Sequence, residues 1–115
     1  DDQMFANIKE IDVQDLSDWM EDNDRDIHVV DVRTPREFQA GSIEGAAHIP
    51  LHLIPLRIND LPKDKELVFI CRTGARSAQA TMFATGQGLD KAHNLRGGLV
   101  NWVRNRLPVA MPHTA

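Results

Sequence analysis

Hydrophobic positions along the chain follow two periodicities. Five short segments, 8–11, 27–32, 46–49, 67–70 and 92–95, are rich in apolar or β-branched residues and predict strands. Between them, apolar residues recur at the three- and four-residue intervals of a helical face. This alternation predicts an α/β fold with a mainly parallel central sheet flanked by helices on both faces. Ligands of such sheets bind where the strands end.

Capping residues mark where the first helices begin. Asp12 stands at the N-cap position of a first helix, and Thr34 with Glu37 forms the capping box of a second. Residues 51–61 carry a helical apolar face, but Pro55 interrupts it. A proline inside a helix removes a backbone hydrogen bond, so we expect a kinked or broken helix in this segment.

Two further helices are expected in the second half of the chain. Residues 77–85 are small and helix-compatible, and Gly97 followed by Gly98 opens a last helix on which Trp102 packs. Prolines then end the regular pattern. We therefore expect one domain over residues 1–115, with a core of about residues 8–107 and a loose tail over 108–115.

Length and charge narrow the class of protein. A chain of 115 residues buries one core, and 13 basic against 17 acidic residues give a net charge of −4. That balance disfavours a nucleic-acid binder with a broad basic face. No apolar run approaches the ~20 residues of a membrane helix, and no signal-peptide pattern follows Asp1. We expect a soluble, cytoplasmic domain without nucleic-acid or membrane partners.

The single cysteine, Cys71, carries the strongest chemical signal. With no second cysteine, an internal disulfide and a thiolate-rich zinc cluster are excluded. One interpretation is an inert, buried residue that only packs. The following turn favours another: around Gly74 the backbone N–H groups can converge on one point before a helix and stabilise a thiolate there. Arg72 and Arg76 would add charge that attracts an oxyanion.

Four other side chains are weaker candidates. Asp31 and Arg33 stand at the end of the second predicted strand, where a structural hydrogen bond or ion pair is expected, with Glu37 as one candidate partner of Arg33. His48 and His52 have the i,i+4 spacing of metal ligands on a helix. A proline between them prevents a regular helix, so we expect no metal site.

Four segments resemble the motifs of the rhodanese family of sulfurtransferases, in the family's order and over nearly the whole chain. They are residues 29–38 (Asp-x-Arg and the following helix), 41–46 (Gly-His-Ile-x-Gly-Ala), 71–77 (the active-site loop) and 95–102 (Gly-Gly-x-x-x-Trp). The departure is Ser42, which stands where the family usually has histidine. Because that position is structural in the family, we expect a local change in hydrogen bonding and retained activity.

The resemblance implies a rhodanese-like fold with Cys71 as nucleophile. It implies substrate-binding roles for the loop residues Arg72, Thr73, Gly74, Ala75, Arg76 and Ser77, and supporting roles for Asp31 and Arg33. Four residues separate Cys71 from Arg76, the spacing of the family's sulfurtransferases. Related phosphatases and arsenate reductases have one residue more, so phosphatase activity is disfavoured. An arginine directly after the cysteine resembles the thiosulfate-using members.

The implied reaction moves sulfane sulfur from thiosulfate, or a similar donor, to cyanide or a thiol through a Cys71 persulfide. No metal or organic cofactor is expected. Because the chain has no second cysteine, the sulfur must leave to an external acceptor, for which a sulfur-carrier protein is a candidate. Two alternatives stay open: a relay module that passes persulfide sulfur between partner proteins, and a non-catalytic docking domain if Cys71 is unreactive.

Overall fold

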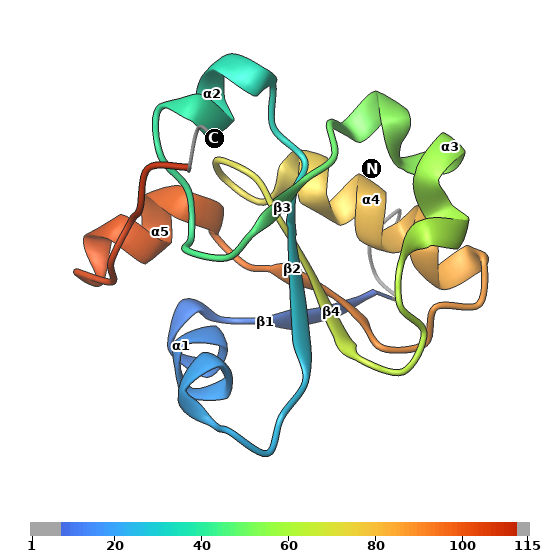
Figure 1. Cartoon of the computed structure of the whole chain (residues 1–115), viewed down its shortest axis with the longest axis horizontal. Helices are drawn as coiled ribbons and strands as arrows, with labels where there is room; N and C mark the ends of the chain where they lie inside the picture. Colours follow the sequence, from blue (N-terminus) through green and yellow to red (C-terminus); the bar gives the residue numbers. More distant parts are fainter. Residues whose placement is uncertain (1–7, 113–115) are drawn as a thin grey trace.

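A computed structural model describes residues 8–112, and its elements follow the predicted succession (Figure 1). The strands are β1 (Lys9–Ile11), β2 (Ile27–Asp31), β3 (Ala47–His48), β4 (Glu66–Ile70) and β5 (Ala92–Leu95). The helices are α1 (Val13–Glu21), α2 (Pro35–Gln39), α3 (Ile54–Arg57), α4 (Ala75–Gly86) and α5 (Gly98–Arg104). Two 3-10 turns, η2 (Leu51–Leu53) and η3 (Ile58–Asp60), flank α3. The α/β fold class is confirmed.

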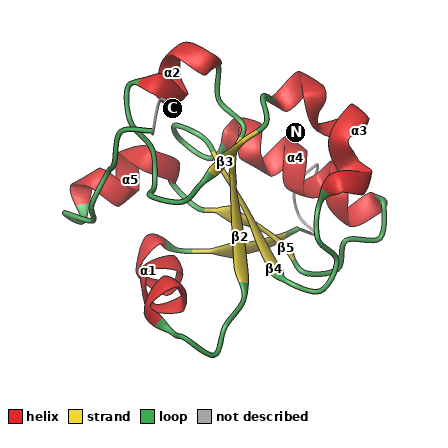
Figure 2. Ribbon diagram, viewed as in Figure 1, coloured by secondary structure: helices red, strands yellow, loops and turns green. Residues whose placement is uncertain are grey.

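The strands form one parallel sheet in the order β1-β5-β4-β2-β3. Figure 2 shows these strands in the middle of the molecule, with the helices around them. Because all the pairings are parallel, the strands reach their carboxyl ends at the same side of the sheet. The turns that follow β2, β4 and β5 therefore meet there, where a ligand site is expected in this architecture.

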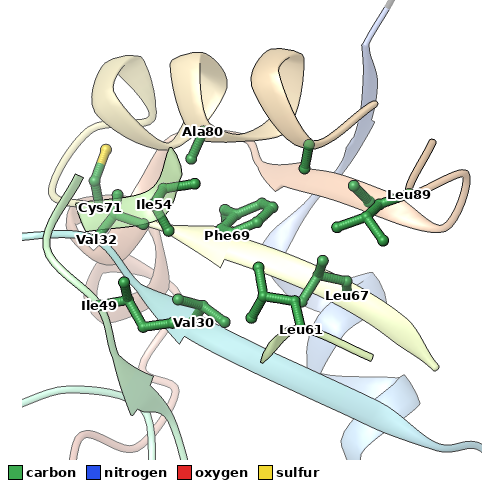
Figure 3. Packing of buried hydrophobic residues seen from close by; sticks show 12 residues of the cluster. Val30, Val32, Ile49, Ile54, Leu61, Leu67, Phe69, Cys71, Ala80 and Leu89 are labelled. Carbon is green, nitrogen blue, oxygen red and sulfur yellow. The ribbon is translucent and has the colours of Figure 1, made fainter. Parts of the chain in front are cut away.

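Helices cover both faces of the sheet through two hydrophobic clusters. One cluster joins Phe69 of β4 to Ile54 of α3 and Ala80 of α4 (Figure 3). The other joins the opposite face to Leu16 of α1 and Trp102 of α5. Alternate residues of β4 enter different clusters, so this strand is apolar along its length because it is buried on both faces.

The helix boundaries agree with the capping signals and refine two expectations. The Thr34–Glu37 capping box is present at α2. The segment 51–61 is broken into η2, α3 and η3, and Pro55 lies in the first turn of α3, where its missing N–H removes no helical hydrogen bond. Helix α4 begins at Ala75, two residues before the predicted start, because Gly74 is its N-cap.

The segment after α5 is held against the domain as far as the structure describes it. Ser42 and Ala110 exchange two backbone hydrogen bonds of 2.9 and 2.8 Å, and Trp102 Nε1 donates to the Pro108 carbonyl at 2.8 Å. The expectation of a loose tail over 108–115 is therefore wrong for 108–112, and its last three residues lie outside the described range. None of the described helices has the length and apolar character needed to cross a membrane.

Candidate functional site

Cys71 directly follows β4 and is 1% exposed. Its side chain belongs to the cluster beneath α3 and α4, but Figure 3 shows the sulfur directed away from that cluster, toward the turn that leads into α4. The Gly74 N–H donates to Sγ at 3.1 Å, and the Ser77 hydroxyl lies 3.3 Å from it. A residue that only packs would have no need of these polar neighbours.

The sulfur lies at the N-terminus of α4, a helix of 12 residues. Gly74, with φ of 106°, is its N-cap, and no side chain caps the helix. That left-handed backbone conformation favours glycine. Uncapped N–H groups and the helix dipole both favour negative charge at this point, so the site suits an anionic sulfur compound.

Helix α5 holds the other side of the loop. The N–H groups of Leu99 and Val100 donate to the carbonyl oxygens of Cys71 and Arg72 at 2.9 and 3.0 Å. A Cβ atom on Gly98 would lie 2.6 Å from both of these oxygens, so only glycine permits the approach. Sequence reasoning treated this glycine as the start of a helix and missed that it supports the loop.

The predicted substrate-binding residues occupy different environments. Gly74 and Ser77 are buried and lie within hydrogen-bond distance of the sulfur. Arg72, Thr73 and Ala75 are exposed on the loop surface, where they can meet a solute. The loop thus has an inner side that contacts the sulfur and an outer side that faces solvent.

Arg76 is held beside the loop by Glu37 of α2. Its two Nη atoms donate to the Glu37 carboxylate oxygens at 2.7 and 2.9 Å, and Glu37 also accepts from the Thr34 backbone. The hydrogen bonds from Arg76 lower the pKa of Glu37 from 4.5 to about 2 and, reciprocally, raise the pKa of Arg76. The considered pairing of Arg33 with Glu37 is therefore wrong: Glu37 fixes an arginine of the loop.

Asp31 and Arg33 form a buried network next to the loop rather than contacts with the sulfur. Arg33 Nη2 donates to Asp31 at 2.8 Å and to the Gly41 carbonyl at 2.6 Å. The Ser42 hydroxyl donates to Asp31 at 2.7 Å, so the serine that stands where the family usually has histidine belongs to this network. Within residues 8–112, neither Asp31 nor Arg33 hydrogen-bonds to Cys71; their contacts instead tie the end of β2 to Gly41 and Ser42.

The two histidines considered as metal ligands have separate surroundings. His48 Nε2 shares a hydrogen bond of 2.8 Å with the Arg33 carbonyl, and its ring stacks on Phe38 with centroids 4.5 Å apart. His52 instead lines a pocket of about 330 Å³ beside Arg76. Among the described residues, no group of three His, Cys, Asp or Glu side chains could hold a metal ion.

That pocket joins segments that sequence reasoning did not connect. It is lined by Val32, Arg33, Thr34, Pro35, Pro50, Leu51, His52 and Arg76.

Sequence reasoning also missed Asn94 of β5, which is 2% exposed and hydrogen-bonds to Gly74 and Ser77. Its signal in the sequence is an amide side chain inside a short strand of otherwise buried residues, where it must find hydrogen-bond partners.

Comparison with known proteins identifies relatives over most of the chain. Residues 12–105 match the family model described as Rhodanese-like domain. A sulfurtransferase of Allochromatium vinosum is 44% identical over 91% of this chain and 97% of its own. The thiosulfate sulfurtransferase GlpE of Pseudomonas entomophila is 32% identical over 64% of this chain and 68% of its own. The solved structure of a rhodanese-related protein from Thermoplasma volcanium matches with a TM-score of 0.82 and 31% identity, covering 90% of this chain and 99% of that one.

Proposed function

The chain belongs to the rhodanese-like domain family, and on that basis we propose that it is a sulfurtransferase that works through a persulfide on Cys71. The observation that carries the proposal is the position of Sγ, at the uncapped N-terminus of α4 and 3.1 Å from the Gly74 N–H. A backbone N–H donor and the N-terminus of a helix there face the sulfur, an arrangement that stabilises negative charge such as that of a persulfide anion.

In the first half-reaction, we propose thiosulfate as the sulfur donor. The Cys71 thiolate attacks the outer sulfur, a new sulfur–sulfur bond forms, and sulfite leaves with the electron pair of the bond that breaks. The enzyme then carries an anionic persulfide, and charge balances because a thiolate and a dianion become a persulfide anion and a dianion. The named relative GlpE and the arginine after Cys71 support thiosulfate as the donor.

Two arginines have different parts in this proposal. Arg72 is exposed and attracts the dianionic donor to the loop. Arg76 is held by Glu37, so its guanidinium group is already oriented when the donor arrives. It lines the pocket of about 330 Å³ beside the loop, which offers the donor a place to dock.

The second half-reaction needs an external acceptor. A cyanide ion, or the thiolate of a small molecule or protein, attacks the outer persulfide sulfur and releases the Cys71 thiolate. Since Cys71 is the single cysteine, no internal thiol can take the sulfur as a disulfide forms. A sulfur-carrier protein is one acceptor of this kind.

Intact-protein mass spectrometry after incubation with thiosulfate tests the reaction. The wild-type chain is expected to gain the mass of one sulfur atom, and cyanide or a thiol is expected to remove it. The matched variant Cys71→Ser is expected to gain nothing, because its hydroxyl cannot form a persulfide. A wild-type mass that thiosulfate leaves unchanged would exclude thiosulfate as the donor.

A relay between proteins is the second candidate, favoured by the lack of an internal resolving thiol. Here a partner's persulfide loads Cys71, and turnover of thiosulfate is incidental. The thiosulfate concentration at half-saturation separates the two: a value far above cellular levels supports the relay, and a comparable value supports the small-molecule enzyme. If neither thiosulfate nor a protein persulfide loads Cys71, the non-catalytic docking function is left.

A further inference from the structure

Among residues 8–112, two groups lie within hydrogen-bond distance of the Cys71 sulfur, and one side chain, Asn94, holds both of them. Asn94 Nδ2 donates to the carbonyl of Gly74 at 3.2 Å, and the N–H of the same glycine donates to Sγ. Asn94 Oδ1 accepts from the Ser77 hydroxyl at 2.5 Å, and that hydroxyl lies 3.3 Å from Sγ. Asn94 thus hydrogen-bonds both to the turn before α4 and to the first turn of that helix.

Glu10 of β1 fixes the orientation of this amide from the edge of the sheet. Glu10 and Asn94 are directly paired in the parallel register of β1 and β5, and Asn94 Nδ2 donates to Glu10 Oε2 at 2.8 Å. The Glu10 carboxylate and the Gly74 carbonyl can only accept, so the amide nitrogen must face them. The amide oxygen is therefore left for Ser77, whose single hydroxyl proton it attracts.

We propose that Asn94 is a positioning residue for sulfur transfer and that Glu10 holds it in its working orientation. The inference rests on the proposed function, since it concerns the reactivity of the same sulfur. Asn94 does not touch Sγ; it acts by holding the Gly74 turn and by setting the direction of the Ser77 hydroxyl. Its loss would leave the thiol in place but move the groups around it.

Substitutions that exchange donor and acceptor in the hydrogen bond between Asn94 and Glu10 test this role. Asn94→Asp keeps the size of the side chain and the acceptor for Ser77, but it removes the donor and sets two carboxylates against each other. Adding Glu10→Gln restores a donor between the two strands, now directed from position 10 to position 94. Glu10→Gln alone keeps an acceptor for Asn94, whereas Glu10→Ala removes it. The matched control is Glu66→Gln. Glu66 of β4 hydrogen-bonds to His93, the neighbour of Asn94 on β5, so the control makes the same change at another contact between strands.

Two reaction rates and the thermal stability are measured for each full-length variant. The rates are alkylation of Cys71 by iodoacetamide and sulfur loading from thiosulfate, both followed by intact mass, and the stability is the Tm. We expect Asn94→Asp to slow both rates about tenfold or more, because a misplaced reactive group costs rate steeply. The double variant is expected to recover about fivefold, as coupled residues do. Glu10→Gln and Glu66→Gln are expected to stay within about twofold of wild type, and Glu10→Ala to be about threefold slower.

A purely structural role for Asn94 predicts a different pattern. The variants would then differ in Tm, but their folded molecules would be alkylated at the wild-type rate, and this result overturns the inference. If Asn94→Asp does not fold, the pair Glu10→Ala and Glu10→Gln decides, and equal rates for these two also overturn it. Failure of thiosulfate to load wild-type Cys71 refutes the donor alone, because the alkylation rates still report on Asn94.

Discussion

Two turns of this molecule are built alike and serve different ends. The turns after β4 and after β5 each place an arginine, Arg72 or Arg96, directly or soon after the strand, and then a left-handed glycine that caps a helix. Gly74 caps α4 and Gly97 caps α5, in both cases without a side-chain hydrogen bond. Helices α1 and α2 differ from both because a capping box gives the N–H groups of their N-cap and N3 residues side-chain acceptors.

What distinguishes the two turns is where the free N–H groups point. In α5 the N–H groups of Leu99 and Val100 donate to carbonyl oxygens of the Cys71 loop. At the start of α4 the Gly74 N–H donates to the sulfur of Cys71. One helix N-terminus thus binds backbone that shapes the site, and the other faces a side chain that can carry negative charge. The loop that places the sulfur at the N-terminus of α4 is thus itself held by the N-terminus of α5.

The largest expected effect comes from breaking the contact between the two turns. In Gly98→Ala the new Cβ would lie 2.6 Å from the Cys71 and Arg72 carbonyl oxygens, at a φ of 58°. Since backbone on both sides cannot easily move, we expect a loss of about 3 kcal/mol or more in the free energy of unfolding, measured by urea denaturation. Sulfur loading should fall with it, because the loop loses its support.

Gly88→Ala is the matched control for this strain. Gly88 has a φ of 91°, but a Cβ atom added there would have no other atom within 4 Å. Only the left-handed conformation is then penalised, at about 1 kcal/mol, and sulfur loading should stay at the wild-type rate. Equal losses for the two alanine variants would show that the loop does not depend on close contact with α5.

The next largest effect concerns Arg72, the exposed arginine in the turn after β4. Arg72→Ala is expected to raise KM for thiosulfate about tenfold with a smaller change in kcat, because a charge that attracts the donor is lost. Added salt should narrow the gap between variant and wild type, since exposed charges are screened. Steady-state kinetics at two ionic strengths measure this. Arg104→Ala, an exposed arginine at the end of α5, is the control and should leave KM unchanged.

Local signals in the sequence predicted most of the fold. The Thr34–Glu37 capping box, the broken helix over residues 51–61 and the five strands each depend on neighbouring residues, and each is present. The turn after Cys71 was likewise predicted from its own residues, and the structure places Gly74 against the sulfur. Periodicity and capping are local properties, so they can be judged without knowing how the elements pack.

The partners of the site could not be predicted in this way. Glu37 gives a local capping signal, yet its carboxylate also meets Arg76, 39 residues along the chain. Asn94 meets Glu10 across 84 residues, through strands whose order in the sheet the sequence pattern does not specify. The same holds for Ala110, whose pairing with Ser42 depends on where α5 ends. Such contacts follow from the packing of distant elements, which local patterns leave open.

The smallest effect that we expect is on stability, and it concerns a charged side chain in the first turn of α4. Arg76 lies in the first turn of α4, where the helix dipole disfavours a cation, and Glu37 offsets this with two hydrogen bonds. The pKa of Glu37 is lowered from 4.5 to about 2, so the pair contributes stability that is full above pH 4.5 and is lost as the pH falls toward 2. Because both side chains are partly exposed, we expect Glu37→Gln to cost about 1 kcal/mol at pH 7.

Urea denaturation of Glu37→Gln and wild type between pH 7 and pH 2 tests this sign. The difference in unfolding free energy should shrink as the pH falls below 4.5, because the wild-type carboxylate becomes protonated and loses its charge. Asp60→Asn is the control, since it removes an ion pair with Arg57 that is exposed on both sides, and it should change stability little at any pH. A Glu37→Gln difference that stays constant with pH would mean that the carboxylate's charge does not stabilise Arg76. Arg76 would then need no carboxylate to offset the helix dipole at the start of α4. The N-termini of α4 and α5 would in that case differ only in that the first faces the sulfur of Cys71.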